Sequence, residues 1–101
     1  MKIRWSRRAK RDLLEIGRFI RLDNPAAARA YLAKLQERAR KASRYPLAGR
    51  IVPEFRREDL REVIEGNYRI VYRVAKRSVD IITIFEGHRL LSPESFDREE
   101  G

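Results

Sequence analysis

The sequence predicts a single α+β domain in which a helical hairpin packs on one face of a small antiparallel sheet. Two observations lead to this fold. Apolar residues recur at helical spacing through the first half of the chain, whereas the second half alternates at the spacing of strands. Helices grouped before strands are typical of α+β proteins rather than of alternating βαβ folds. A chain of 101 residues can bury one hydrophobic core, and we expect one domain spanning residues 1–101.

The N-terminal segment predicts a short strand followed by a helix. Residues 3–5 alternate apolar and basic side chains, which indicates a brief edge strand, and Ser6 is a residue type that caps helices. Basic residues fill the outer faces of the helix, as is typical of a solvated surface. Its apolar stripe consists of Ala9, Leu13, Ile16 and Ile20.

A second helix is predicted to follow after a few residues. Asn24 can cap its first turn, and Pro25 suits the first helical position because the N–H there has no partner within the helix. The helix should end just before Pro46, since proline disfavours helical geometry in the preceding residue. Two such helices are expected to pack antiparallel as a hairpin. The apolar stripe of the second consists of Ala28, Leu32, Leu35, Ala39 and Ala42.

Three consecutive antiparallel strands are predicted from residue 60 onwards. Residues 60–65 form the first strand, and Gly66-Asn67 form a tight turn into the second, residues 68–74, where tyrosine, isoleucine, tyrosine and valine occupy every second position. Residues 79–85 are apolar on both parities, as a central strand covered on two faces would be. With the N-terminal strand included, the sheet would have four strands; without it, three.

Two segments complete the chain. Residues 46–53 are rich in turn-forming and apolar residues, so we expect this connector to lie against the body of the domain. Residues 92–101 are polar and are expected to fray.

The composition is strongly basic, with 24 Lys and Arg residues against 15 Asp and Glu residues, a net charge of +9 and a pI near 10.6. Such a charge suits a nucleic-acid-binding protein or a protein whose obligate partner is acidic. The chain contains no cysteine, which excludes disulfides and thiolate sites, and one histidine, which argues against a histidine-rich metal site. No metal and no cofactor are therefore expected.

Targeting and membrane segments are not evident in the sequence. The N-terminus has the charge of a secretory signal, but no apolar core follows it. No stretch approaches the roughly 18 apolar residues of a membrane span. The sequence therefore predicts a soluble, cytoplasmic protein without a membrane partner.

The predicted sheet carries arginines that a core strand does not need. On one side of the sheet, arginines could hold a phosphodiester bidentately, and a nearby histidine could act as general acid or base. Alternatively, the same arginines form ion pairs with acidic residues on neighbouring strands. The candidate site residues are Arg61, Arg69, Arg73, His88 and Arg89. The candidate ion-pair partners are Glu62, Glu65, Asp80 and Glu86.

Several of these motifs occur together in one known group of proteins. The helical hairpin, the connector 46–54, Leu60-Arg61-Glu62, the strand 68–74 and the later His88-Arg89 follow one another in this order. In this the chain resembles the ParE/RelE superfamily of toxins from bacterial type II toxin–antitoxin modules. The resemblance covers nearly the whole chain, and it implies a RelE/ParE-like fold and a cognate antitoxin, ParD-like or related, that wraps the toxin.

The connector and Leu60-Arg61-Glu62 resemble the ParE, or plasmid-stabilisation, branch more closely than other branches. That branch implies a toxin that inhibits DNA gyrase and stabilises its cleaved complex with DNA, without catalytic residues of its own. In this interpretation Arg61, Arg69, Arg73 and Arg89 are candidates for binding the target or the antitoxin.

The alternative implied by the resemblance is a RelE-like endoribonuclease that cuts mRNA on the ribosome. Arg61 and Arg89 would then hold the scissile phosphate, and His88 would move a proton. The sequence departs from the RelE pattern, because no tyrosine follows Arg89 and only Arg56 and Arg57 replace the lysines expected before residue 60.

A simple RNA-binding module is a third possibility, and it would need aromatic side chains displayed on the sheet. Tyr68 and Tyr72 share a parity, but we expect both to face the core.

Overall fold

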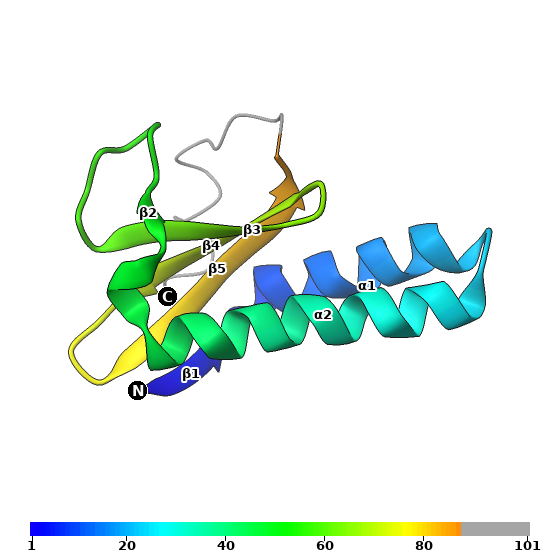
Figure 1. The fold of residues 1–101 in the computed structure, drawn as a ribbon, viewed down its shortest axis with the longest axis horizontal. Helices are drawn as coiled ribbons and strands as arrows, with labels where there is room; N and C mark the ends of the chain where they lie inside the picture. The colour runs from blue at the N-terminus through cyan, green and yellow to red at the C-terminus, as the bar shows by residue number, and fades with distance from the viewer. Residues whose placement is uncertain (88–101) are drawn as a thin grey trace.

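The computed structural model describes residues 1–87, and in it two antiparallel helices pack on one face of a five-stranded mixed sheet (Figure 1). The strand order across the sheet is β1-β5-β4-β3-β2. The elements are β1 (Lys2–Trp5), α1 (Arg7–Arg21), α2 (Pro25–Arg44), the 3₁₀ helix η1 (Pro46–Ala48), β2 (Arg50–Ile51), β3 (Leu60–Glu65), β4 (Tyr68–Val74) and β5 (Ser78–Glu86).

The α+β layout and the three-stranded meander are confirmed, but the sheet is larger than the three or four strands predicted. The additional strand is β2, which lies inside the connector and pairs with β3 at the opposite edge from β1. Two residues are too few to show the alternation that identifies a strand. The sheet is also mixed rather than antiparallel, because β1 runs parallel to β5.

Both helices begin where the sequence predicts. The Ser6 side chain accepts a hydrogen bond from the Ala9 N–H at 2.9 Å, and the Asn24 side chain accepts one from the Ala27 N–H at 3.0 Å. These bonds satisfy N–H groups that have no partner inside the helix. The predicted apolar stripes face the sheet, and their buried members include Ala9, Ile16, Leu35, Ala39 and Ala42.

The larger core lies between the helices and the sheet. Tyr72 is fully buried there, together with Ile70 from the same strand, and Tyr68 packs against the edge of this core. The prediction that Tyr68 and Tyr72 face the core is therefore confirmed. The Tyr68 ring meets the ring of Tyr31 from α2, with centroids 5.8 Å apart. These tyrosines are not displayed as a stacking platform for bases.

The turn between β3 and β4 is the tight turn predicted at Gly66-Asn67. Gly66 has φ of 59°, in a region that L side chains rarely adopt, whereas Asn67 is not among the residues of positive φ. A glycine of positive φ at the first central position is typical of a type II′ hairpin turn. The turn sets the register in which Glu65 pairs with Tyr68.

Helix α1 completes the edge of β5 beyond the end of β1. The last pair of the parallel ladder is Trp5 with Ile81, after which the Ser6 hydroxyl donates to the Ile82 carbonyl at 2.8 Å. The Asp12 carboxylate then accepts from the Thr83 hydroxyl at 2.6 Å and from the Ile84 N–H at 2.9 Å. A side chain of α1 thus takes the place of a neighbouring strand. Burial raises the pKa of the Asp12 carboxyl, against the lowering effect of these hydrogen bonds.

The stability of Asp12→Asn relative to that of the wild type is expected to increase as the pH rises from 4 to 7. The raised pKa means that Asp12 favours folding most strongly below its unfolded pKa of about 3.9, and that this contribution is lost as the pH rises through the folded pKa. Asparagine can accept from the Ile84 N–H without a buried charge. Urea unfolding at both pH values measures the effect, with the exposed Asp23→Asn as control. An equal difference from wild type at both pH values would contradict this expectation.

Candidate functional site

A buried ion-pair network occupies the sheet face opposite the helices. The Arg69 guanidinium donates from Nε to Glu62 Oε1 at 2.7 Å, from Nη1 to Glu54 Oε2 at 2.7 Å, and from Nη2 to Glu54 Oε1 at 2.8 Å. The Glu62 side chain is 0% exposed, and the Arg69 side chain is 5% exposed. The contact with Glu54 is bidentate, the strong form of an arginine–carboxylate pair.

Two further side chains complete this network. Arg50 of β2 donates from Nε to the second oxygen of Glu62, so that the buried carboxylate lies between two guanidinium groups. The Phe85 ring lies 5.0 Å from the Arg69 guanidinium carbon, within the range of a cation–π interaction. The hydrogen bonds that Arg69 donates to Glu54 raise its pKa above its usual value, and those that it donates to Glu62 add to this, against the lowering effect of burial. Arg69 is therefore held as a permanent internal cation.

The segment between β2 and β3 covers this face of the sheet. Val52 and Leu60, at the two ends of that segment, are both fully buried and join Val71 and Ile82 in a second, smaller apolar cluster. Phe55 packs against the cluster from within the segment. The Arg69 guanidinium and the Glu62 carboxylate therefore lie beneath a covering loop, whereas the Arg50 side chain is 61% exposed.

Arg61 lies on the other parity of β3, where it holds two connecting segments together. Its Nε donates to the Glu58 carbonyl at 2.9 Å, and its Nη1 donates to the Leu47 carbonyl at 3.2 Å and to the Gly49 carbonyl at 3.0 Å. The guanidinium thus joins the connector before β2 to the loop before β3. Next to it, the Tyr72 hydroxyl donates to the Pro46 carbonyl at 2.6 Å.

The structure does not bring the three described candidate arginines together at one site. Arg73 is partly exposed and lies 3.9 Å from Asp80, on the neighbouring strand. The sequence offered ion pairs as the alternative role of these arginines. The structure contains such pairs between Arg69 and Glu62 and between Arg73 and Asp80. The remaining candidates, His88 and Arg89, lie outside the described residues.

Sequence reasoning missed Glu54 and Arg50 as members of the network. The signal for Arg50 was available only through the register of β2, in which Arg50 lies opposite Glu62. Glu54 belongs to a loop whose return over the sheet leaves no periodic trace in the sequence. Within residues 1–87, no group of His, Cys, Asp and Glu side chains could hold a metal ion.

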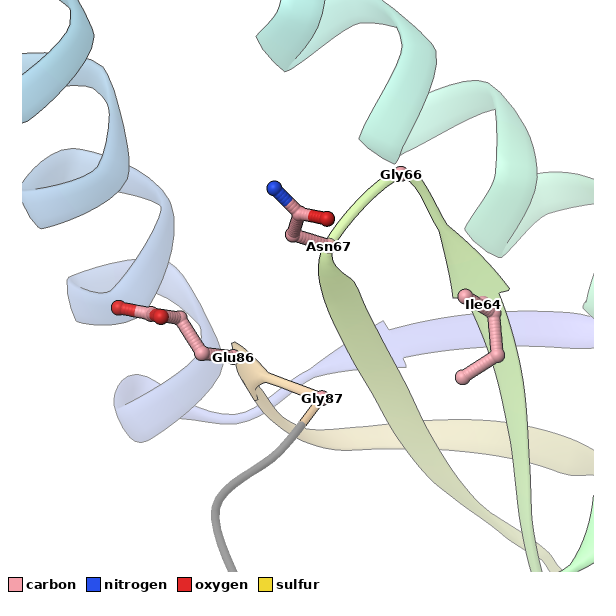
Figure 2. Close-up of a pocket in the computed structure, with 5 residues that line it drawn as sticks. All are labelled: Ile64, Gly66, Asn67, Glu86 and Gly87. Carbon is pink, nitrogen blue, oxygen red and sulfur yellow. The ribbon is translucent and has the colours of Figure 1, made fainter.

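A shallow depression of about 470 Å³ lies where the β3–β4 turn meets the end of β5. Figure 2 shows the side chains of Asn67 and Glu86 pointing away from Ile64. Gly66 and Gly87 are exposed and contribute only backbone to the lining. The Gly87 N–H donates to the Asn67 carbonyl at 2.7 Å, which ties the two segments together. Among residues 1–87, the lining offers one carboxylate and one amide, and no pair of groups that could act as acid and base.

Two sequence comparisons identify the class of protein to which the chain belongs. Residues 3–91 match the sequence profile of the family described as ParE toxin of type II toxin-antitoxin system, parDE. The chain is 36% identical over 90 residues to a protein named "Putative toxin Y4kP" from Sinorhizobium fredii, an alignment that covers 87% of this chain and 90% of that protein. These matches define a toxin of the ParE/RelE superfamily.

Two solved structures show the same fold. One is described as a chromosomal ParDE TA system from P. aeruginosa, with a TM-score of 0.69 and 21% identity, covering 85% of this chain and 95% of that one. The other is the toxin–antitoxin complex RelBE2 from Mycobacterium tuberculosis, with a TM-score of 0.60 and 27% identity, covering 84% and 95% of the two chains. By the match over residues 3–91, the chain belongs to the ParE toxin family.

No helix among residues 1–87 is both long and apolar enough to cross a membrane.

Proposed function

We propose that this ParE-family toxin inhibits DNA gyrase in the cytoplasm and is neutralised by a cognate antitoxin of the ParD type. The observation that carries the proposal is the family match over residues 3–91. The arrangement of the candidate arginines supports inhibition by binding rather than by phosphodiester cleavage. Arg69 is enclosed by Glu54 and Glu62, so its guanidinium is not presented to a substrate.

An antitoxin partner is supported by the composition and by the structural relatives. The net charge of +9 suits an acidic partner, because opposite charges accelerate association and select the partner. Both similar structures are described as toxin–antitoxin systems or complexes. The proposed antitoxin would therefore cover part of a strongly basic surface.

The second candidate function is ribosome-dependent cleavage of mRNA. The likeness to a RelBE2 complex at 27% identity favours it, as does the single histidine, His88, next to Arg89 in the sequence. In this function Arg61 and Arg89 bind the phosphate, and His88 transfers the proton. The structure has Arg61 bound to three backbone carbonyls through Nε and Nη1, which reduces its capacity to bind a phosphate bidentately.

Brief induction of the protein in bacteria, followed by parallel measurement of DNA and mRNA integrity, tests the proposal. Gyrase inhibition predicts DNA breaks and an SOS response while mRNA stays intact. Cleavage of translated mRNA at codon-spaced sites, with intact DNA, would instead establish the second function. Co-expression of the antitoxin should restore growth in either case.

His88→Ala is expected to leave toxicity unchanged, because a gyrase inhibitor has no proton to transfer at this residue. The measurement is colony formation after induction, at equal protein levels. A loss of toxicity of tenfold or more, with the folded protein still accumulating, would move the assignment to the nuclease. Normal growth with the wild-type protein would contradict both functions.

A further inference from the structure

The charge of the chain is concentrated in the helical hairpin. Residues 7–44 contain 12 basic and 4 acidic residues, a net charge of +8, against +9 for the whole chain. The rest of the chain therefore contributes a net charge of only +1. In the sheet, Arg69 and Arg73 are paired with carboxylates of the same domain. The hairpin therefore carries nearly all of the net positive charge of the chain.

Five of these cations lie on one face of α1, and we call the four of them other than Arg7 the α1 basic face. Lys10, Arg11, Arg18 and Arg21 project within an arc of about 100°, with Leu14 at its centre, on the side of the helix opposite its buried stripe. All of them are exposed, and Leu14 is 62% exposed. The loop end of the hairpin projects past the sheet (Figure 1). Arg18 and Arg21 belong to the last turn of α1, next to that loop.

The α1 basic face is not neutralised by the protein itself. Within residues 1–87, none of Lys10, Arg11, Arg18 and Arg21 is within ion-pair distance of a carboxylate. The contrast with α2 is clear, because there Arg40 and Arg44 share Glu37 at 3.1 and 3.3 Å. Of the two carboxylates of α1, Asp12 is directed to β5. Glu15 lies one turn from Arg11 and from Arg18 at the edge of the face, but it is not within ion-pair distance of either.

We propose that the α1 basic face binds the phosphate backbone of duplex DNA. Its cations form two pairs, Lys10 with Arg11 and Arg18 with Arg21. The midpoints of the pairs are about 13 Å apart along the helix axis, at 1.5 Å per residue. The major groove of B-DNA is about 12 Å wide, so the two pairs can reach phosphates on its opposite walls. This binding is independent of sequence, because no base edge is contacted.

The geometry favours duplex DNA over RNA. The major groove of an A-form helix is deep and narrow, so its width does not match two cation pairs about 13 Å apart. Three of the four cations are arginines, whose planar guanidinium groups bind phosphate oxygens bidentately. DNA binding goes beyond the proposed function and does not depend on it, but it would place the toxin on the substrate of gyrase.

Fluorescence anisotropy with a labelled 24-base-pair duplex of mixed sequence tests the proposal on the full chain. We expect a dissociation constant on the order of 10 μM at 100 mM salt, and a slope of log K against log salt of about −3.6 for four phosphate contacts. Arg18→Glu with Arg21→Glu should weaken binding at least tenfold and roughly halve the slope. The neutral pair Arg18→Gln with Arg21→Gln keeps the helix polar and should also halve the slope.

The matched control carries the same charge change on another surface. Lys76→Glu with Arg77→Glu alters two exposed residues of the β4–β5 turn and should weaken DNA binding less than threefold. Equal losses in both double variants would overturn the proposal, as would no binding by the wild-type chain at 50 mM salt. Tighter binding to an RNA duplex of the same sequence would also contradict it.

An acidic protein is the other partner that this face could accept. Phe19 and Leu22 are exposed beside Arg18 and Arg21, around a depression of about 330 Å³, and apolar side chains flanked by arginine are common in protein interfaces. The antitoxin therefore serves as a second probe. If Arg18→Glu with Arg21→Glu left DNA binding unchanged and weakened antitoxin binding, the DNA proposal would be wrong. Failure of the wild-type chain to bind the antitoxin would instead count against the proposed function.

Discussion

Arg69→Ala is expected to lower the free energy of unfolding by about 3–5 kcal/mol, the range for removing one partner of a buried ion pair. The carboxylate of Glu62 is 0% exposed and would lose the cation that donates to it from β4. Arg50 would remain bound to one of its oxygens, and Glu54 would add a second nearby negative charge. The large effect arises from the uncompensated charge more than from the lost attraction.

Urea unfolding followed by circular dichroism measures this effect. Arg4→Ala is the control, because the Arg4 side chain is 67% exposed and lies 3.7 Å from Asp80 in an ordinary surface pair. Such a pair contributes about 1 kcal/mol or less. If Arg69→Ala lost no more stability than Arg4→Ala, the network would not be the stabilising feature described above. Because Arg69→Ala is expected to destabilise the fold, toxicity of an Arg69 variant should be compared with that of the wild type at equal amounts of folded protein.

Gly49→Ala is expected to cost roughly 2–4 kcal/mol, from overpacking together with a lost hydrogen bond. A Cβ atom at residue 49 would lie 2.2 Å from the Tyr72 hydroxyl oxygen and 2.8 Å from the backbone carbonyl oxygen of Glu62. The Tyr72 hydroxyl could retreat only by breaking its bond to the Pro46 carbonyl. The Glu62 carbonyl belongs to β3, in the register that pairs with β2, and cannot retreat without disturbing that edge.

A double-mutant cycle with Tyr72→Phe separates the two contacts of the added methyl group. Phenylalanine removes the hydroxyl, so Gly49→Ala should cost less in the Tyr72→Phe background than in the wild type. Gly87→Ala is the control, because its Cβ would meet neighbouring atoms only at 3.4 Å or more. The control should change stability by about 0.5 kcal/mol or less. Full additivity of the two substitutions would show that the Tyr72 contact is not the source of the cost.

The parts of the fold that sequence could predict are those with a local signal. The helical stripes, the caps at Ser6 and Asn24 and the turn at Gly66 depend on neighbouring residues, and each is present in the structure. The parallel pairing of β1 with β5 joins residues about 76 positions apart, and nothing in either segment specifies it locally. The direction of such a distant pairing is fixed by the path of the chain through the intervening elements.

The candidate site was predictable to the same extent. Glu62 could be named as a partner of Arg69 because the two lie on adjacent strands of a predicted hairpin. Glu54 could not, because it reaches Arg69 from a loop whose path over the sheet is set by the burial of Val52 and Leu60. The partners of Arg61 are backbone carbonyls, which every residue has, so no residue type could indicate them.

The parallel pairing of β1 with β5 also has a consequence for the synthesis of this toxin in the cell. The Ser6 hydroxyl donates to the carbonyl of Ile82, which is 76 residues further along the chain. A ribosome that adds 5–20 residues per second needs roughly 4–15 s to synthesise these residues. During that interval the helical hairpin can form, but β1 has no neighbouring strand to pair with. The nascent chain therefore lacks a complete sheet until β5 has been translated and released from the ribosome. For those seconds the chain is present in the cell without its complete fold.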